Sequence, residues 1–153
     1  MIAEKGLEQW HRIIRDMSVE ALDEVLADDV VFHSPIVHTP QEGRDLTRLY
    51  LMAAFNVLPG DSPSSSSEEG TNGDSQSASA KSDFKYVREV VGERDAVLEF
   101  VTKVDGIIVN GIDMIRWNDE GKIVDFKVMV RPLKAIQKLH AQMAAMLETM
   151  KNA

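Results

Sequence analysis

One carboxylate lies inside a strongly apolar stretch of the sequence, at Asp113 in Ile112-Asp113-Met114. Side chains alternate between the two faces of a β-strand, so the face that carries Asp113 also carries Val109, Gly111, Ile115 and Trp117. The matching series on the neighbouring predicted strands are Leu98, Phe100, Thr102 and Val104, and Phe126, Val128 and Val130. An apolar environment disfavours ionisation, so we expect a raised pKa for Asp113 and a role as hydrogen-bond donor or acid. The alternative is an Asp that faces solvent or pairs with a backbone amide or a basic side chain.

The residues around Ser34-Pro35 could supply a base. Imidazole is the side chain best suited to proton transfer near neutral pH, and His33 and His38 flank this dipeptide. Strand alternation points His33 away from the face that carries Phe32 and Ser34, so His38 in the following loop is the better candidate. The alternative for both is an ordinary surface histidine. Because no carboxylate lies at a convincing spacing and the chain has no cysteine, the sequence predicts no metal site, and no cofactor is expected.

Two helices are predicted before this region. Apolar residues recur every three or four positions at the start of the chain, which is typical of a helix with one buried face. They are Leu7, Trp10, Ile13, Ile14 and Met17. Ser18 is a predicted N-cap, and a second short helix is expected to follow it and to end near Asp28-Asp29.

A short strand and a third helix are expected next. Residues 30–32 favour a strand, which Pro35 ends or confines to a sheet edge. Thr39 and Glu42 have the spacing of a capping box, with Pro40 at the first helical position, so a helix is predicted from there to Pro59-Gly60.

The remaining sequence indicates an insertion, four strands and a last helix. Residues 60–82 are rich in Ser and almost wholly small or polar, so we expect a flexible insertion. The ranges 84–91, 96–104, 107–117 and 122–131 favour strands, and their short connectors imply an antiparallel meander. A helical pattern of apolar residues runs from Leu133 to Met150. We therefore predict one α+β domain over residues 1–153, with a curved antiparallel sheet wrapped around helices and a ligand-sized pocket.

Composition excludes several classes of partner. The 153 residues carry a formal net charge of −8 without a basic cluster, so nucleic acid is not an expected partner. No apolar stretch has the length of a membrane span, and the N-terminus does not resemble a signal peptide. The expected location is the cytoplasm.

Several stretches resemble the SnoaL-like, nuclear transport factor two-like superfamily. They are residues 26–32, Ser34-Pro35, Gly43, residues 111–118 and residues 121–124. The resemblance implies a cystatin-like cone, and this fold carries isomerases, cyclases, hydrolases, dehydratases and non-catalytic binders. Homodimers are common in the superfamily, so a homodimer is expected, formed through the convex sheet face and Trp117.

Two enzyme branches of the superfamily can be compared position by position. The ketosteroid isomerases use an Asp before Pro as base, a Tyr on the first helix, and a neutral Asp on a late strand. Here these positions hold Ser34, Trp10 and Asp113, so one of three is retained. At the position of the second Asp of the limonene epoxide hydrolases this chain has Val128. Neither residue set is preserved.

The resulting expectation is a protein that binds an apolar small molecule in a conical pocket. The predicted lining residues are Phe32, Tyr50, Phe100, Val109, Ile115, Phe126 and Val128. Acid/base isomerase, cyclase or dehydratase chemistry would use Asp113 as donor and His38 as base, with Ser34 and Trp10 at the remaining positions. The alternative is a non-catalytic dimerisation or interaction module whose cone is filled by its own side chains.

Overall fold

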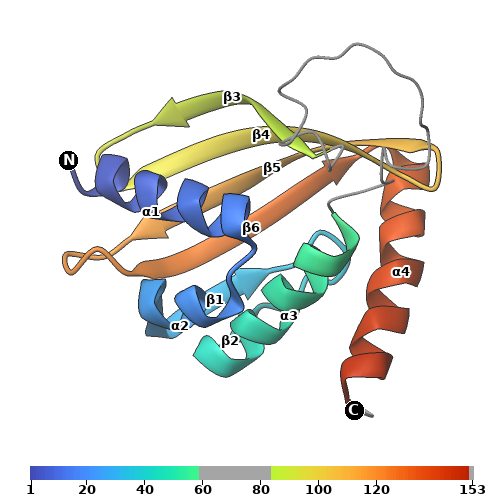
Figure 1. Cartoon of the computed structure of the whole chain (residues 1–153), viewed down its shortest axis with the longest axis horizontal. Helices are drawn as coiled ribbons and strands as arrows, with labels where there is room; N and C mark the ends of the chain where they lie inside the picture. The colour runs from blue at the N-terminus through green and yellow to red at the C-terminus, as the bar shows by residue number, and fades with distance from the viewer. Residues whose placement is uncertain (59–83, 152–153) are drawn as a thin grey trace.

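A curved six-stranded sheet with helices on its concave side forms the protein (Figure 1). The computed structural model describes residues 1–58 and 84–151. In chain order the elements are α1 (Ile2–Asp16), α2 (Val19–Val25), β1 (Leu26–His33), β2 (Gln41–Glu42), α3 (Arg44–Val57), β3 (Lys85–Val91), β4 (Asp95–Val104), β5 (Ile107–Trp117), β6 (Ile123–Arg131) and α4 (Leu133–Lys151). The predicted α+β class is therefore confirmed.

The sheet is mixed, whereas the sequence predicted an antiparallel one. Its strand order is β2-β1-β6-β5-β4-β3, and β3 to β6 form the expected antiparallel meander. Strand β1 pairs with β6 in parallel. These two strands are far apart in the sequence, so no hairpin forces them to be antiparallel. Their register places Phe32 directly beside Phe126, which brings two aromatic rings to the same face.

Helix α1 packs closely on the sheet because Gly6 has no side chain. A Cβ atom on Gly6 would lie 2.2 Å from Nε1 of Trp117. Trp117 is 1% exposed, so it is part of the core and not of a dimer surface, and this part of the expectation is wrong. Ser18 caps α2 as predicted, since its Oγ accepts a hydrogen bond from the Ala21 amide at 3.3 Å.

The chain between α2 and α3 departs from the prediction. Helix α2 ends at Val25 instead of near Asp28-Asp29, because Leu26 already pairs with Ile123 of β6 and the segment continues as a strand. Asp28 and Asp29 are exposed on this strand, while Val30 is buried. Backbone pairing with a long neighbouring strand outweighs the local helical pattern.

The predicted capping box does not start a helix. Gln41 and Glu42 instead form β2 against Phe32 and Val31. The amide of Gly43 donates to the carbonyl of Val30 at 2.8 Å, and Gly43 has a φ of 102°, which favours glycine. Helix α3 therefore begins at Arg44, after this turn.

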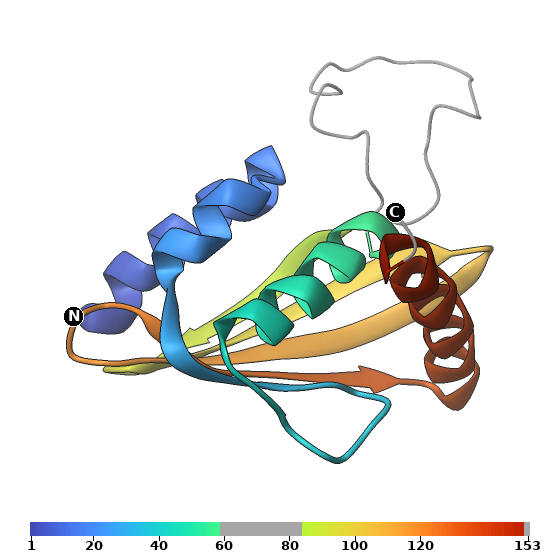
Figure 2. The same cartoon turned by 90° about the horizontal axis from the view of Figure 1, so that it is seen from below.

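Helices α1, α3 and α4 lie on the concave side of the sheet, and α4 stands at one end of it (Figure 2). No helix of the described residues covers the convex face. The Ser-rich segment predicted at 60–82 lies outside the described residues. Within the described ranges, no helix is long and apolar enough to cross a membrane.

Candidate functional site

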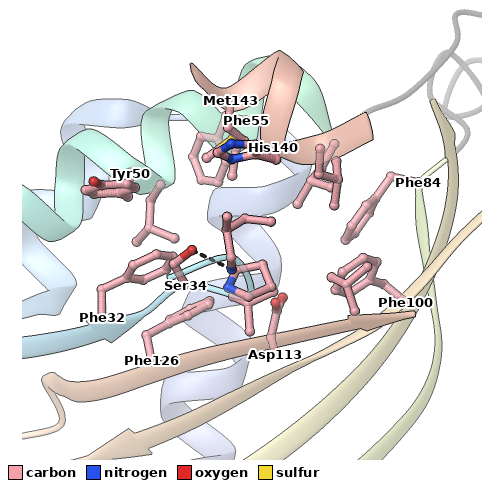
Figure 3. Close-up of a pocket in the computed structure, with 18 of the residues that line it drawn as sticks. Phe32, Ser34, Tyr50, Phe55, Phe84, Phe100, Asp113, Phe126, His140 and Met143 are labelled. Carbon is pink, nitrogen blue, oxygen red and sulfur yellow. Dashed lines mark hydrogen bonds between the residues drawn. The ribbon is translucent and has the colours of Figure 1, made fainter. Parts of the chain in front are cut away.

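A cavity of about 250 Å³ lies between the concave sheet face and helices α1, α3 and α4. Aromatic side chains from helices and strands contribute much of its wall, as Figure 3 shows. They include Phe32, Tyr50, Phe55, Phe84, Phe100 and Phe126. The ring centroids of Phe32 and Tyr50 are 5.6 Å apart, and those of Phe84 and Phe100 are 5.1 Å apart. Such walls favour an apolar ligand, with orientation left to a few polar groups.

Gly111 allows Phe100 to lie across strand β5 at the cavity wall. A Cβ atom at this position would be 2.6 Å from Cζ of Phe100 and 2.6 Å from the carbonyl oxygen of Met129. Any larger residue would have to push one of these atoms aside. The glycine therefore helps to define the shape of the cavity next to Asp113.

A chain of two hydrogen bonds leads to Asp113, the carboxyl group that lines the cavity among the described residues. The indole N–H of Trp10 donates to the hydroxyl oxygen of Tyr86 at 3.0 Å. The Tyr86 O–H donates to Oδ2 of Asp113 at 2.6 Å. Indole nitrogen is a donor only, so it sets the direction of the whole chain. Because the Tyr86 proton is committed to Asp113, this chain of hydrogen bonds can offer a further proton to a ligand only from Asp113.

Burial raises the pKa of Asp113 to about 7. The hydrogen bond from Tyr86 acts in the opposite direction, because it favours the ionised form. Asp113 is 6% exposed and faces the cavity among aromatic rings. Burial and the neighbouring Asp113 carboxyl raise the pKa of Tyr86 well above 10.0. Asp113 is thus a weak acid whose protonation changes near neutral pH.

The structure brings together most of the residues that the sequence singled out. Trp10, Ser34 and Asp113 all line the cavity, and so do Phe32, Tyr50, Phe100, Phe126 and Val128. The Ser34 hydroxyl oxygen accepts hydrogen bonds from the amides of Ile36 at 2.9 Å and Val37 at 3.4 Å. Figure 3 shows Ser34 at the edge of the cavity. Ser34 therefore shapes the loop at the cavity edge.

Val109 and Ile115 are buried but lie outside the cavity lining. They share a sheet face with Asp113, but each sits towards one end of β5. Ile115 packs in the core with Trp10 and Leu98, whereas Val109 packs with Ala135 and Leu139 of α4. Strand alternation identifies the face of a residue, but it does not tell where helices cover that face.

His38, the predicted base, is exposed and does not line the cavity. The loop that carries it leads outward to β2, because the predicted helix does not start at Thr39. His33 points to the other side of the sheet, as expected, and its Nε2 lies 3.0 Å from Oδ2 of Asp125. The structure thus separates both histidines from Asp113.

Two polar residues of the cavity were missed by the sequence analysis. Tyr86 alternates with Lys85 on β3 and pairs with Phe100, so the same inward series would have included it. His140 of α4 also lines the cavity. It is spaced with Met143 and Leu147 along one helix face, a pattern that the apolar stripe at Leu139 obscured.

In the described ranges, no group of three His, Cys, Asp or Glu side chains is placed to hold a metal ion. The chemistry that the cavity residues can perform themselves is hydrogen bonding and proton transfer.

Solved structures of other proteins share this architecture. No protein-family model and no curated protein sequence matches the chain. A steroid delta-isomerase from Pseudomonas aeruginosa is 32% identical with a TM-score of 0.81, over 99% of this chain and 96% of that one.

Two further structures support the same assignment. A cystatin-like protein from Silicibacter pomeroyi is 26% identical with a TM-score of 0.72, over 92% and 83% of the two chains. An NTF2-like protein from Mesorhizobium loti has the same fold at 16% identity and a TM-score of 0.59, over 85% and 93% of the two chains. The chain therefore belongs to the SnoaL-like, nuclear transport factor two-like (NTF2-like) superfamily.

Proposed function

We propose that the cavity binds a neutral, apolar small molecule that carries a hydrogen-bond-accepting oxygen, and that protonated Asp113 donates to this oxygen. The observation that carries the proposal is the directed chain from Trp10 through Tyr86 to Asp113, which ends at an aromatic cavity wall. In the protonated state, Oδ2 accepts from Tyr86 and the remaining O–H is available to a ligand. A carbonyl oxygen fits this single donor.

The proposed chemistry is acid/base isomerisation of a carbonyl compound. Support comes from the 32% identity to a steroid delta-isomerase over nearly the whole chain. Asp113 would stabilise the negative charge that develops on the carbonyl oxygen when a neighbouring carbon loses a proton. Ser34 is not the base, since a serine hydroxyl does not accept a proton from carbon near neutral pH. Cyclisation or dehydration would need the same donor.

A matched pair of ligands tests the proposal. A bicyclic ketone and its parent hydrocarbon have nearly the same apolar surface, but only the ketone accepts a hydrogen bond. At ligand concentrations about 100-fold above Kd, we expect the ketone to raise the melting temperature by about 5–10 °C. Equal stabilisation by the hydrocarbon, or no stabilisation by any ketone of a size series, would contradict the proposal.

Asp113 variants add a control for the protonation state. Asp113→Leu removes the donor and should abolish the preference for the ketone. Asp113→Asn keeps an N–H donor that does not ionise. We expect its ketone affinity to be independent of pH, whereas wild-type affinity should fall about tenfold per pH unit above the pKa of Asp113.

The competing function is an interaction module with a self-filled cone. That reading required Trp10, Tyr50 and Phe126 to plug the cone, but all three lie in the wall of a cavity that keeps about 250 Å³. The volume is just below the range of roughly 300–1,000 Å³ for sites of drug-sized ligands, so a small ligand is expected. The cavity therefore favours ligand binding. A homodimer and a cytoplasmic location stay predictions.

A further inference from the structure

The hydroxyl of Ser34 keeps its proton available, whereas the donors of Trp10 and Tyr86 are committed inside the protein. The indole N–H of Trp10 donates to Tyr86, and the Tyr86 O–H donates to Asp113. Ser34 directly follows β1 and also lines the cavity. Among the described residues, no acceptor is found for the Ser34 O–H. This proton can therefore be donated to a molecule in the cavity.

Two backbone amides restrict the direction of this O–H. The Ser34 oxygen accepts from the amide of Ile36 at 2.9 Å and from the amide of Val37 at 3.4 Å. A hydroxyl oxygen has two lone pairs and one proton, so both lone pairs of Ser34 face the loop that follows it. The proton must then lie on the remaining side of the oxygen. Ser34 is at the cavity edge (Figure 3), where a ligand can accept this proton.

The residues next to Ser34 in the cavity wall are apolar. Phe32, Pro35 and Ile36 line the cavity on either side of it in the chain. A ligand that presents only hydrocarbon to this part of the wall displaces water from the hydroxyl and leaves its hydrogen bond unmade. A ligand that presents an acceptor oxygen restores that bond. A hydroxyl in such surroundings discriminates between ligands by whether they carry the acceptor.

We propose that Ser34 donates a hydrogen bond to a second oxygen of the ligand while Asp113 binds the carbonyl oxygen. The inference rests on the proposed function and extends it from one polar contact to two. The ligand class that follows is a small apolar compound with a carbonyl and a second acceptor oxygen, such as a bicyclic diketone. Two polar contacts fix the orientation of a ligand that the aromatic walls alone would leave free to rotate.

The probes are a decalone and a set of decalindiones that carry the second carbonyl at different ring positions. Calorimetric titration of wild-type protein should find an isomer that binds about 3–10-fold more tightly than the decalone, the gain of one hydrogen bond between neutral groups. In Ser34→Ala this isomer should lose its advantage, with the affinity for the decalone unchanged within about twofold. Ser34→Thr keeps a hydroxyl and should keep the advantage.

Ser18→Ala is the matched control. The Ser18 hydroxyl also accepts from a backbone amide, that of Ala21 at 3.3 Å, but Ser18 lies outside the cavity lining, so the variant should keep the preference for the diketone. A purely structural role of Ser34 would weaken the binding of decalone and diketone equally in Ser34→Ala, and that result overturns the inference.

The comparison of ligands on wild-type protein needs no variant, so it tests the inference even if Ser34→Ala does not fold. Wild-type protein that binds the decalone but prefers none of the diketones overturns the inference, and the proposed binding function stands. Wild-type protein that binds neither the decalone nor any diketone overturns the proposed function itself.

Discussion

A buried carboxyl group with a raised pKa makes folding depend on pH in a defined direction. The pKa of Asp113 is about 7 in the folded protein against 3.8 ordinarily, so between these values the folded state binds more protons than the unfolded state. The free energy of unfolding that Asp113 contributes is complete below about pH 4 and is lost as pH rises through about 7, at up to about 1.4 kcal/mol per pH unit.

Asp113→Asn should remove this loss, because an amide does not ionise. Urea unfolding of both proteins across this pH range measures the difference in their free energies of unfolding. We expect the variant to gain stability relative to wild type as pH rises. Parallel curves for the two proteins would mean that the Asp113 carboxyl ionises as easily in the folded chain as in the unfolded one.

The hydroxyl of Tyr86 lowers the pKa of Asp113 and so opposes the effect of burial. Tyr86→Phe removes the hydrogen bond that favours the ionised carboxyl, so the pKa of Asp113 should rise further above its wild-type value. It also leaves the Trp10 indole N–H without its acceptor, at a cost of about 1–3 kcal/mol of stability. Carboxyl ¹³C shifts of Asp113 followed through a pH titration measure the change.

Trp10→Phe is the comparison for this measurement. It removes the donor to Tyr86 but keeps the hydrogen bond from Tyr86 to Asp113. Trp10→Phe should therefore change the pKa of Asp113 less than Tyr86→Phe does. If Tyr86→Phe lowered the pKa of Asp113 or left it unchanged, the directed chain of hydrogen bonds would not operate.

At the scale of elements, periodicity predicted most of the helices and strands. It could not predict which strands pair with each other or where the helices pack. The stripe at Leu7, Trp10 and Ile13 is local information, and α1 forms as predicted. Whether Leu26 continues a helix or joins a strand depends on Ile123, almost a hundred residues away. For the same reason the alternation that identified Asp113 did not reveal that Tyr86 and His140 meet it at one cavity, since strand order and helix placement decide this.

Gly111 of strand β5 offers a test of how the missing side chain determines the shape of the cavity. Gly111→Ala places a Cβ atom within 2.6 Å of both Phe100 and the Met129 carbonyl, so the ring or the neighbouring strand must move. Overpacking of this kind costs about 1–3 kcal/mol, and we expect weaker ketone binding as well. Chemical unfolding and calorimetric titration check the two effects.

The matched variant for this test is Gly92→Ala. A Cβ atom there would meet only the Asp95 carbonyl oxygen, at 3.4 Å, and Gly92 does not line the cavity. It should retain wild-type ketone affinity and lose far less stability than Gly111→Ala. Similar losses in both variants would show that the contact with Phe100 has no special importance.

At the scale of the whole molecule, the convex face of the sheet explains why a homodimer is expected. No helix of the described residues covers this face (Figure 2). It presents apolar side chains, with Ile108 53% and Met129 50% exposed. Ile112 pairs with Met129 across β5 and β6, so both lie on one surface. Arg116 of β5 and Asp95 of β4 form an ion pair on the same face. This pair offers one positive and one negative group for contacts with a second copy.

We predict that the protein sediments as a dimer through its convex sheet face and that Met129→Lys converts it to a monomer, because dimerisation would then bury an unpaired ammonium group. Ketone affinity should be preserved, since Met129 points away from the cavity. Leu133→Lys is the control. It changes a residue of α4 that is 68% exposed, and it should leave the dimer intact. Sedimentation velocity of the three proteins decides the matter, and a wild-type monomer at the highest attainable concentration would rule out this surface as a dimer interface.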